Sequence, residues 1–114
     1  MELNAYQTRA AATAIYPGRD DPSDILGLAY TAMGLSGEAG EILNKTKKII
    51  RDNDGVIDGI VKTKIIAELG DVLWYTALVA NQLGYPLQLV ADWNLEKLAG
   101  RAERGTLQGS GDVR

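Results

Sequence analysis

Two pairs of acidic residues with the same spacing could carry chemistry in this sequence. Glu38 and Glu41 form the first pair, and Glu68 and Asp71 form the second. Residues three apart on an α-helix share a face, so each pair presents two carboxylates in the same direction. Apolar residues flank both pairs, which places the acids close to core-facing sectors. Two such helices side by side would bring four carboxylates together.

A cluster of carboxylates in a poorly solvated site repels itself unless a cation or protons neutralise it. The chain contains no His and no Cys, so its side chains can hold a metal only through oxygen atoms. Oxygen ligands favour magnesium, manganese or calcium. Because Mg²⁺ also shares its ligand shell with substrate phosphates, the pattern indicates hydrolysis of a phosphate ester or anhydride.

Basic and polar residues recur on the helix faces that carry the acids, or form a stripe of their own. They are Lys45 and Lys48 after the first pair, Lys64 and Tyr75 around the second, and Asn94, Lys97 and Arg101 near the C-terminus. Cations beside a metal site are complementary to a metal–polyphosphate substrate.

Each of these features also has a simpler explanation. An isolated acidic pair at this spacing is most often a solvated helix face, and lysines near a helix C-terminus interact favourably with its dipole. The stripe that begins at Asn94 could be the polar side of an amphipathic helix. Trp74, Tyr75 and Trp93 suit a core or an interface better than a base-stacking platform. Spacing alone therefore leaves the metal site as one reading among several.

The acidic loop at residues 52–59 invites comparison with a calcium-binding EF-hand. Its third ligand position falls on Val56, and its glycine is misplaced for that motif. A plain turn is the better prediction for this loop.

The hydrophobic pattern is helical along almost the whole chain, with no alternating strand pattern. Ser23 or Asp24 can cap the second helix, Asp58 the third, and Gly84 ends the third. Helices are expected at about residues 4–16, 25–51, 59–83 and 86–104. The predicted fold class is all-α, a four-helix-type bundle of four to five helices. Residues 1–104 form its single domain, and residues 105–114 form a Gly- and Ser-rich tail.

Four glycines lie inside the second predicted helix, where each costs about 1 kcal/mol relative to Ala. They are Gly27, Gly34, Gly37 and Gly40. Such a number indicates close approach of another backbone or of a ligand, or a local break in the helix.

Length and composition limit the function and the partners. The chain has 114 residues with 15 acidic and 12 basic side chains, so a dedicated nucleic-acid binder is not expected. No apolar run is long enough for a membrane span and no signal-peptide pattern opens the chain, so a cytoplasmic protein is expected. One short chain has little room to bury Trp74, Trp93 and the apolar faces of two long helices. We therefore expect a homo-oligomer.

The two acidic pairs also resemble a family signature. The segments 38–41 (EAGE) and 68–71 (ELGD), 26 residues apart, are similar to the ExxE…ExxD motif of MazG-like nucleoside triphosphate pyrophosphohydrolases, in the all-α NTP pyrophosphatase superfamily. The similarity extends over about residues 28–112 and includes the flanking segments GLSGEAGEILNKTKK and ELGDVLWYTALVANQLGY. It is greatest to the short, single-domain proteins of phages and bacteria.

The resemblance implies a helical bundle assembled as a dimer or a dimer of dimers. It implies Mg²⁺-dependent hydrolysis, with Mn²⁺ as a possible substitute, of the α–β phosphoanhydride to nucleoside monophosphate and pyrophosphate. The implied metal ligands are Glu38, Glu41, Glu68 and Asp71, with Glu38 or Glu41 orienting the attacking water or accepting its proton. The implied substrate contacts are Tyr75, Asn94 and Lys97, while Lys45, Lys48 and Arg101 rest on helical geometry and weaker analogy.

The resemblance leaves the substrate and the tail open. Phage relatives favour deoxynucleoside triphosphates, with a lean toward purines such as dGTP, and the location would then be the bacterial host cytoplasm. The alternatives are a phosphoribosyl-ATP pyrophosphohydrolase or a non-catalytic module that binds nucleotide or a partner protein. The tail is either a frayed terminus or a flap over bound nucleotide, in which Arg114 or Ser110 reaches phosphate or a neighbouring subunit.

Overall fold

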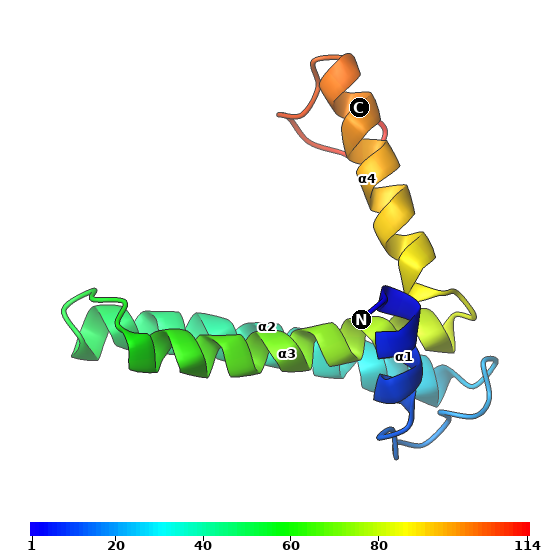
Figure 1. Cartoon of the computed structure of the whole chain (residues 1–114), viewed down its shortest axis with the longest axis horizontal. Coiled ribbons are helices and arrows are strands. Elements are labelled where there is room, and N and C mark those ends of the chain that lie inside the picture. The colour runs from blue at the N-terminus through cyan, green and yellow to red at the C-terminus, as the bar shows by residue number, and fades with distance from the viewer.

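The computed structural model describes residues 1–114 and contains four helices and no strand. They are α1 (Leu3–Ala11), α2 (Ile25–Asp52), α3 (Gly59–Gln82) and α4 (Leu87–Glu103). The long helices α2 and α3 form an antiparallel hairpin, α1 crosses one end of it, and α4 leads away from that end (Figure 1). The all-α prediction is confirmed.

Most helix ends follow from the local sequence. The Asp24 side chain accepts a hydrogen bond from the backbone N–H of Leu26, and Asp58 accepts one from Val61, so both predicted caps are present. Gly84 takes a positive φ of 80° directly after α3, a conformation that glycine adopts at little cost.

The first helix ends earlier than the sequence predicts, at Ala11 instead of about Tyr16. The Thr13 hydroxyl donates to the carbonyl oxygen of Ala10 at 2.9 Å, which gives the backbone an alternative to helix continuation. The chain turns there, and both Ala14 and Tyr16 enter the core from outside the helix.

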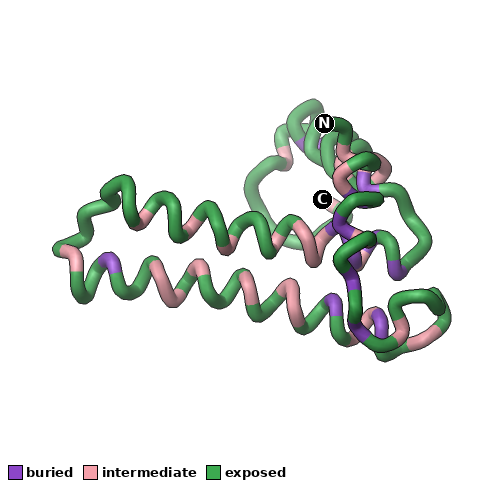
Figure 2. Tube along the Cα trace, turned by 60° about the horizontal axis from the view of Figure 1, so that its bottom comes forward, coloured by how far each residue is buried: buried purple, intermediate pink, exposed green.

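The core lies where α1 crosses the hairpin, not along the hairpin itself (Figure 2). Trp74 packs against the edge of this cluster, and its indole N–H donates to the hydroxyl of Thr13 at 2.9 Å. The buried members of the cluster are Ala10, Ala14, Tyr16, Ala77, Leu78 and Leu87.

A buried glutamine joins three segments at this end. The Gln7 side chain donates to the carbonyl oxygens of Ala77 and Tyr85 at 3.2 and 3.0 Å. Its own oxygen accepts from the backbone N–H of Leu87 at 2.9 Å. These bonds fix α1 against α3 and against the first turn of α4, because each satisfies a polar group removed from water.

Two of the four glycines in α2 meet side chains of α3. A Cβ on Gly27 would overlap the amide of Gln82, and a Cβ on Gly34 would overlap the ring of Tyr75. Nothing lies within 4 Å of the Cβ position at Gly37 or Gly40. The predicted close approach is therefore present at two positions, and the helix continues without a break.

One chain is unusually extended for its length. Its radius of gyration is 17.0 Å, against about 13 Å for a compact domain of this size. Its accessible surface is 7913 Å², against roughly 6,100 Å² for a typical monomer of this mass. Only 13 of 114 residues are buried.

The four helices pack together as the all-α prediction expects, but α4 does not lie along the hairpin. The helix α4 contacts α1 and α3 and has no contact with α2 (Figure 1). Because α1 occupies the end of the hairpin where α4 begins, α4 projects outward instead of lying along α2 and α3. None of the four helices combines the length and mean hydropathy that crossing a bilayer requires.

Candidate active site

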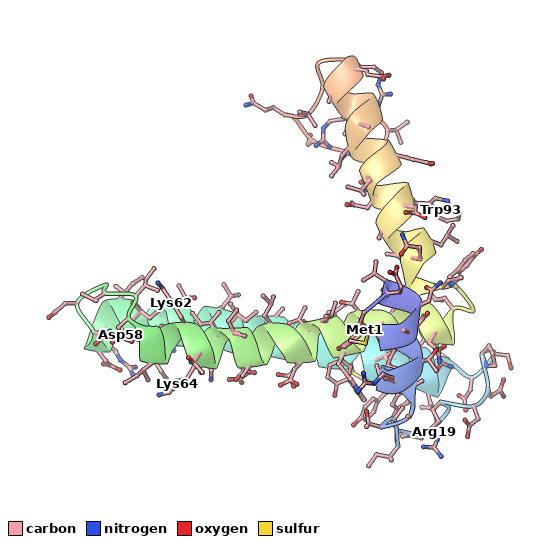
Figure 3. All side chains as sticks on the ribbon, viewed as in Figure 1. Met1, Arg19, Asp58, Lys62, Lys64 and Trp93 are labelled. Atoms are coloured by element: carbon pink, nitrogen blue, oxygen red, sulfur yellow. The ribbon has the colours of Figure 1, made fainter.

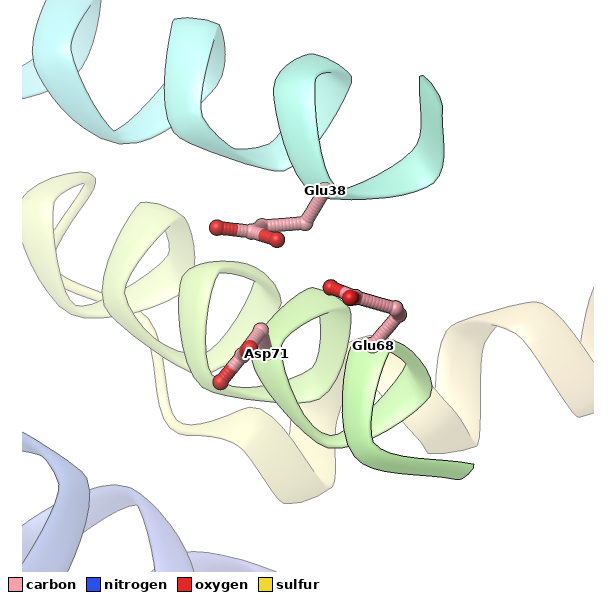
Figure 4. A group of neighbouring side chains, drawn as sticks. All are labelled: Glu38, Glu68 and Asp71. Atoms are coloured by element: carbon pink, nitrogen blue, oxygen red, sulfur yellow. The ribbon is translucent and has the colours of Figure 1, made fainter. Parts of the chain in front are cut away.

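Three of the four predicted acids come together between the long helices. Glu38 on α2 faces Glu68 on α3, and Asp71 lies about one turn further along α3 (Figure 4). One carboxylate oxygen of each lies within 4.8 Å of the others. This acid trio (Glu38, Glu68 and Asp71) is the only group of three or more acidic side chains in the chain with such a geometry.

Glu41 does not join the trio in this structure. Its side chain is exposed, one turn along α2 from Glu38. Its charge still reaches the trio, since it is the smallest of the influences that raise the pKa of Glu38.

The pKa values of the two facing carboxylates, Glu38 and Glu68, shift in opposite directions. Partial burial, a hydrogen bond to Glu68 and the charge of Asp71 raise the pKa of Glu38 above its ordinary value. The pKa of Glu68 is lowered, first by its hydrogen bond to Lys45. Burial and the neighbouring carboxylates thus disfavour the charged form of Glu38, and a divalent cation would relieve the repulsion between the carboxylates.

Lys45 connects the acids to the basic side of the site. Its ammonium lies 2.9 Å from a carboxylate oxygen of Glu68, and both side chains are largely removed from solvent. The hydrogen bond to Glu68 raises the pKa of Lys45, so this group stays cationic.

An aromatic region adjoins the trio on the side away from the hairpin loop. Tyr75 lies against Gly34, as described above, and its neighbour Tyr30 stacks on Tyr16 with ring centroids 5.1 Å apart. Burial raises the pKa of Tyr75, followed by the influence of Tyr30 and Glu38. A flat ring system could lie beside Tyr30, which remains 43% exposed.

The other end of the hairpin carries a basic cavity of about 320 Å³. We call it the lysine pocket; it is lined by Lys45, Lys48, Ile49, Asp52, Asn53, Val61 and Lys64. It begins at Lys45, next to the acid trio, and extends toward the loop between α2 and α3.

The predicted contacts on α4 lie apart from the trio within one chain. Asn94 lines a separate cavity of about 250 Å³ in the angle between α3 and α4. Lys97 and Arg101 lie further out on the projecting helix, 3.8 and 3.6 Å from Asp112 of the tail. Since α4 does not contact α2, this chain does not bring these three residues to its own acids.

Residues 28–106 match the family model of the MazG nucleotide pyrophosphohydrolase domain. The chain belongs to this family. It is also 55% identical over 114 residues, the whole of both chains, to the Gene 37 protein of Mycobacterium phage L5. No solved structure matches it.

The segment that matches the family model includes the acid trio. The matched segment contains α3, α4 and the part of α2 that follows Leu28. It therefore includes every acid, lysine and tyrosine that the two long helices bring together. It implies nucleotide pyrophosphohydrolase activity in general terms, without indicating the preferred nucleotide.

The tail folds back on α4 without forming a helix. Arg101 is only 5% exposed beneath it and donates to the carbonyl oxygen of Gly111 at 3.3 Å. Arg114 bonds within the tail, to the carbonyl oxygens of Thr106 at 3.0 Å and Leu107 at 3.2 Å. The tail thus covers Arg101, a predicted substrate contact. The side chain of the last residue, Arg114, donates hydrogen bonds to the tail itself.

One neighbour of the site was missed in the sequence. Tyr6 on α1 is half-buried, and burial, followed by the charge of Asp71, raises its pKa. No local signal points to it, because its approach to Asp71 depends on how α1 crosses the hairpin.

Proposed function

We propose that this protein hydrolyses (deoxy)nucleoside triphosphates at the α–β phosphoanhydride, giving a nucleoside monophosphate and pyrophosphate, with Mg²⁺ or Mn²⁺. The observation that carries the proposal is the acid trio between α2 and α3 of a MazG domain, with Lys45 beside it.

The donor set fits a hard divalent cation. It consists of carboxylate oxygens alone, and burial, followed by the neighbouring acids, raises the pKa of Glu38. Glu38, Glu68 and Asp71 would hold the cation, and we propose Glu41 as a further ligand because it follows Glu38 on the same helix face. When bound, such a cation supplies activation of water and neutralisation of phosphate charge.

The chain's own groups then have separate roles. We propose that a carboxylate oxygen of Glu38 or Glu41 accepts the proton of the water that attacks the α-phosphorus. Lys45 holds the carboxylate of Glu68 and presents positive charge to the phosphates. Tyr75, fixed against Gly34, borders the place where the nucleoside lies.

We further propose that the protein acts as a homo-oligomer, a dimer or a dimer of dimers. Large apolar side chains on α3 and α4 remain exposed, among them Ile66, Leu69, Trp93 and Leu95. In such an assembly the projecting α4 of one copy can carry Asn94 and Lys97 to the acids of another, whereas Arg101 is covered by the tail.

A substrate panel tests the activity. Pyrophosphate release should be measured with Mg²⁺ for all deoxynucleoside and ribonucleoside triphosphates and for phosphoribosyl-ATP. We expect turnover of deoxynucleoside triphosphates, with purines such as dGTP among the better substrates. Preference for phosphoribosyl-ATP would assign the other member of the superfamily, and absence of turnover on the whole panel would leave a binding module.

A further inference from the structure

Arg101 is buried although it lies near the outer end of α4. Among the helices, α4 contacts only α1 and α3, and beyond Trp93 it leads away from the hairpin (Figure 3). An arginine on such a projecting helix would ordinarily be exposed. Lys97, one turn earlier on the same face, keeps 43% of its side chain exposed, whereas Arg101 is only 5% exposed beneath residues 105–114. The burial of Arg101 is therefore a property of the tail and not of the helix packing.

The tail leaves the guanidinium group of Arg101 incompletely bonded. Its Nη2 atom lies 3.3 Å from the carbonyl oxygen of Gly111, and its Nε atom has no hydrogen-bond partner. No other buried side-chain nitrogen in the chain lacks a partner. A buried donor without an acceptor costs free energy, and a charged donor costs more than a neutral one. This cost is relieved when the guanidinium meets water or an anion that offers more acceptor oxygens.

Asp112 places one negative charge between two cations of α4. An oxygen of its carboxylate lies 3.8 Å from the ammonium of Lys97 and 3.6 Å from the guanidinium of Arg101. The Asp112 side chain is 89% exposed, so water and salt screen both interactions and each is weak. A phosphate group carries more negative charge and can bind a guanidinium through two oxygens at once. A polyphosphate would therefore displace this carboxylate.

The tail is held against α4 by polar contacts and not by a buried apolar face. Its two large apolar side chains, Leu107 and Val113, are both more than half exposed. The backbone N–H of Thr106 donates to the carbonyl oxygen of Arg101 at 2.8 Å. A surface segment that buries little apolar area opens at a low cost in free energy. The tail can thus leave α4 while the core at the far end of the helix stays folded.

We propose that residues 105–114 form an autoinhibitory strap, in which Asp112 occupies a phosphate position between Lys97 and Arg101. The inference rests on the proposed function, in which α4 of one copy approaches the substrate held by the acids of another. With the strap closed, Arg101 is withheld from the substrate and Lys97 is partly neutralised. A bound polyphosphate displaces Asp112, and the strap opens so that Arg101 meets the phosphates. The strap therefore makes phosphate binding by α4 weaker than its own cations would allow.

Binding of inorganic tripolyphosphate tests the strap without a nucleoside. Its dissociation constant should be measured by calorimetry with Mg²⁺ for the full-length wild type, Asp112→Asn and Glu103→Gln. Asp112→Asn should bind about two- to fivefold more tightly, because the exposed carboxylate no longer competes. Glu103 is exposed at the end of α4 and forms no ion pair within 4.0 Å. The control Glu103→Gln removes the same charge and should stay within about 1.5-fold of the wild type.

Hydrogen exchange at one backbone amide reports whether the strap opens. The N–H of Thr106 bonds to Arg101 when the tail is folded back, so opening removes its protection. Its exchange with D₂O, followed by NMR, should be faster by about threefold or more in Asp112→Asn. The same acceleration is expected in the wild type saturated with tripolyphosphate.

Equal affinity of Asp112→Asn and the wild type, or an equal gain in Glu103→Gln, would overturn the strap, as would a failure of both Asp112→Asn and the wild type to bind tripolyphosphate. Weaker binding by Asp112→Asn, or exchange of Thr106 that is unchanged or slower on binding, would also overturn it, since a flap that closes over its ligand gives these results. Turnover of deoxynucleoside triphosphates on the same samples tests the proposed function separately. Turnover with no effect of Asp112→Asn on affinity would contradict the strap alone, and tighter binding with an opened tail but no turnover would contradict the proposed function alone.

Discussion

The ammonium group of Lys45 lies 2.9 Å from a carboxylate oxygen of Glu68, and this ion pair joins α2 to α3 beside the acid trio. It lowers the pKa of Glu68, while the pKa of the facing Glu38 is raised. The pKa values of two carboxylates in one small site therefore shift in opposite directions, since Lys45 stabilises the charged form of Glu68 whereas burial and neighbouring acids disfavour the charged form of Glu38.

Removal of this lysine should destabilise the hairpin. In Lys45→Gln the melting temperature should fall by roughly 3–6 °C near neutral pH, since Glu68 then adds uncompensated charge. The lowered pKa of Glu68 means that its stabilising contribution is present above its unfolded pKa and lost as the pH falls through its folded pKa. The difference from wild type should thus disappear in acid. Lys47→Gln is the control, and an equal loss there would contradict the account.

The contribution of Glu38 to stability should depend on pH in the opposite direction from that of Glu68. Its pKa is raised, so its charge opposes folding increasingly as the pH rises through that pKa. In EDTA, Glu38→Gln should therefore raise the melting temperature by roughly 1–4 °C at neutral pH, with no gain in acid. Thermal unfolding across pH measures this. A variant that is less stable than wild type at neutral pH would show that the trio is not self-repelling.

Two glycines of α2 provide a matched test of how Tyr75 is held. In Gly34→Ala the new methyl group would overlap the Tyr75 ring, so stability should fall by about 1–3 kcal/mol and turnover should decline. In Gly37→Ala the methyl group meets open space, so stability should rise by up to about 1 kcal/mol. Chemical denaturation of both variants measures the difference, and equal effects would contradict the contact.

The assembly state can be measured directly. With an accessible surface of 7913 Å² and Trp93 58% exposed, the chain should associate at micromolar concentration. Light scattering should give the mass of a dimer or a tetramer, and Trp93→Lys should shift it toward the monomer. A stable monomeric wild type would remove the route by which α4 reaches the acids of another copy.

The sequence predicts a cluster of four acids from local determinants, and the structure brings together Glu38, Glu68 and Asp71 but not Glu41. Helical spacing places Glu68 and Asp71 on one face, and the loop at residues 52–59 sets the antiparallel register that brings Glu38 opposite them. The caps Asp24 and Asp58 are equally local, and both appear in the structure.

The remaining features depend on contacts between distant segments. Gln7 fixes α1 across the hairpin through three hydrogen bonds to residues 70 or more positions away, and this places Tyr6 near Asp71. The outward course of α4 follows from that crossing. The burial of Arg101 results from the tail folding back. No local pattern in the sequence specifies these arrangements.

The position of bond cleavage tests the central claim most directly. A deoxynucleoside triphosphate should be incubated with the protein and Mg²⁺ and the products followed by ³¹P NMR, with EDTA, Asp71→Asn and the loop variant Asp54→Asn in parallel. The account predicts nucleoside monophosphate and pyrophosphate from the wild type and Asp54→Asn, and a rate at least about 100-fold lower with EDTA or in Asp71→Asn. Release of orthophosphate with nucleoside diphosphate, or undiminished turnover in Asp71→Asn, would contradict it.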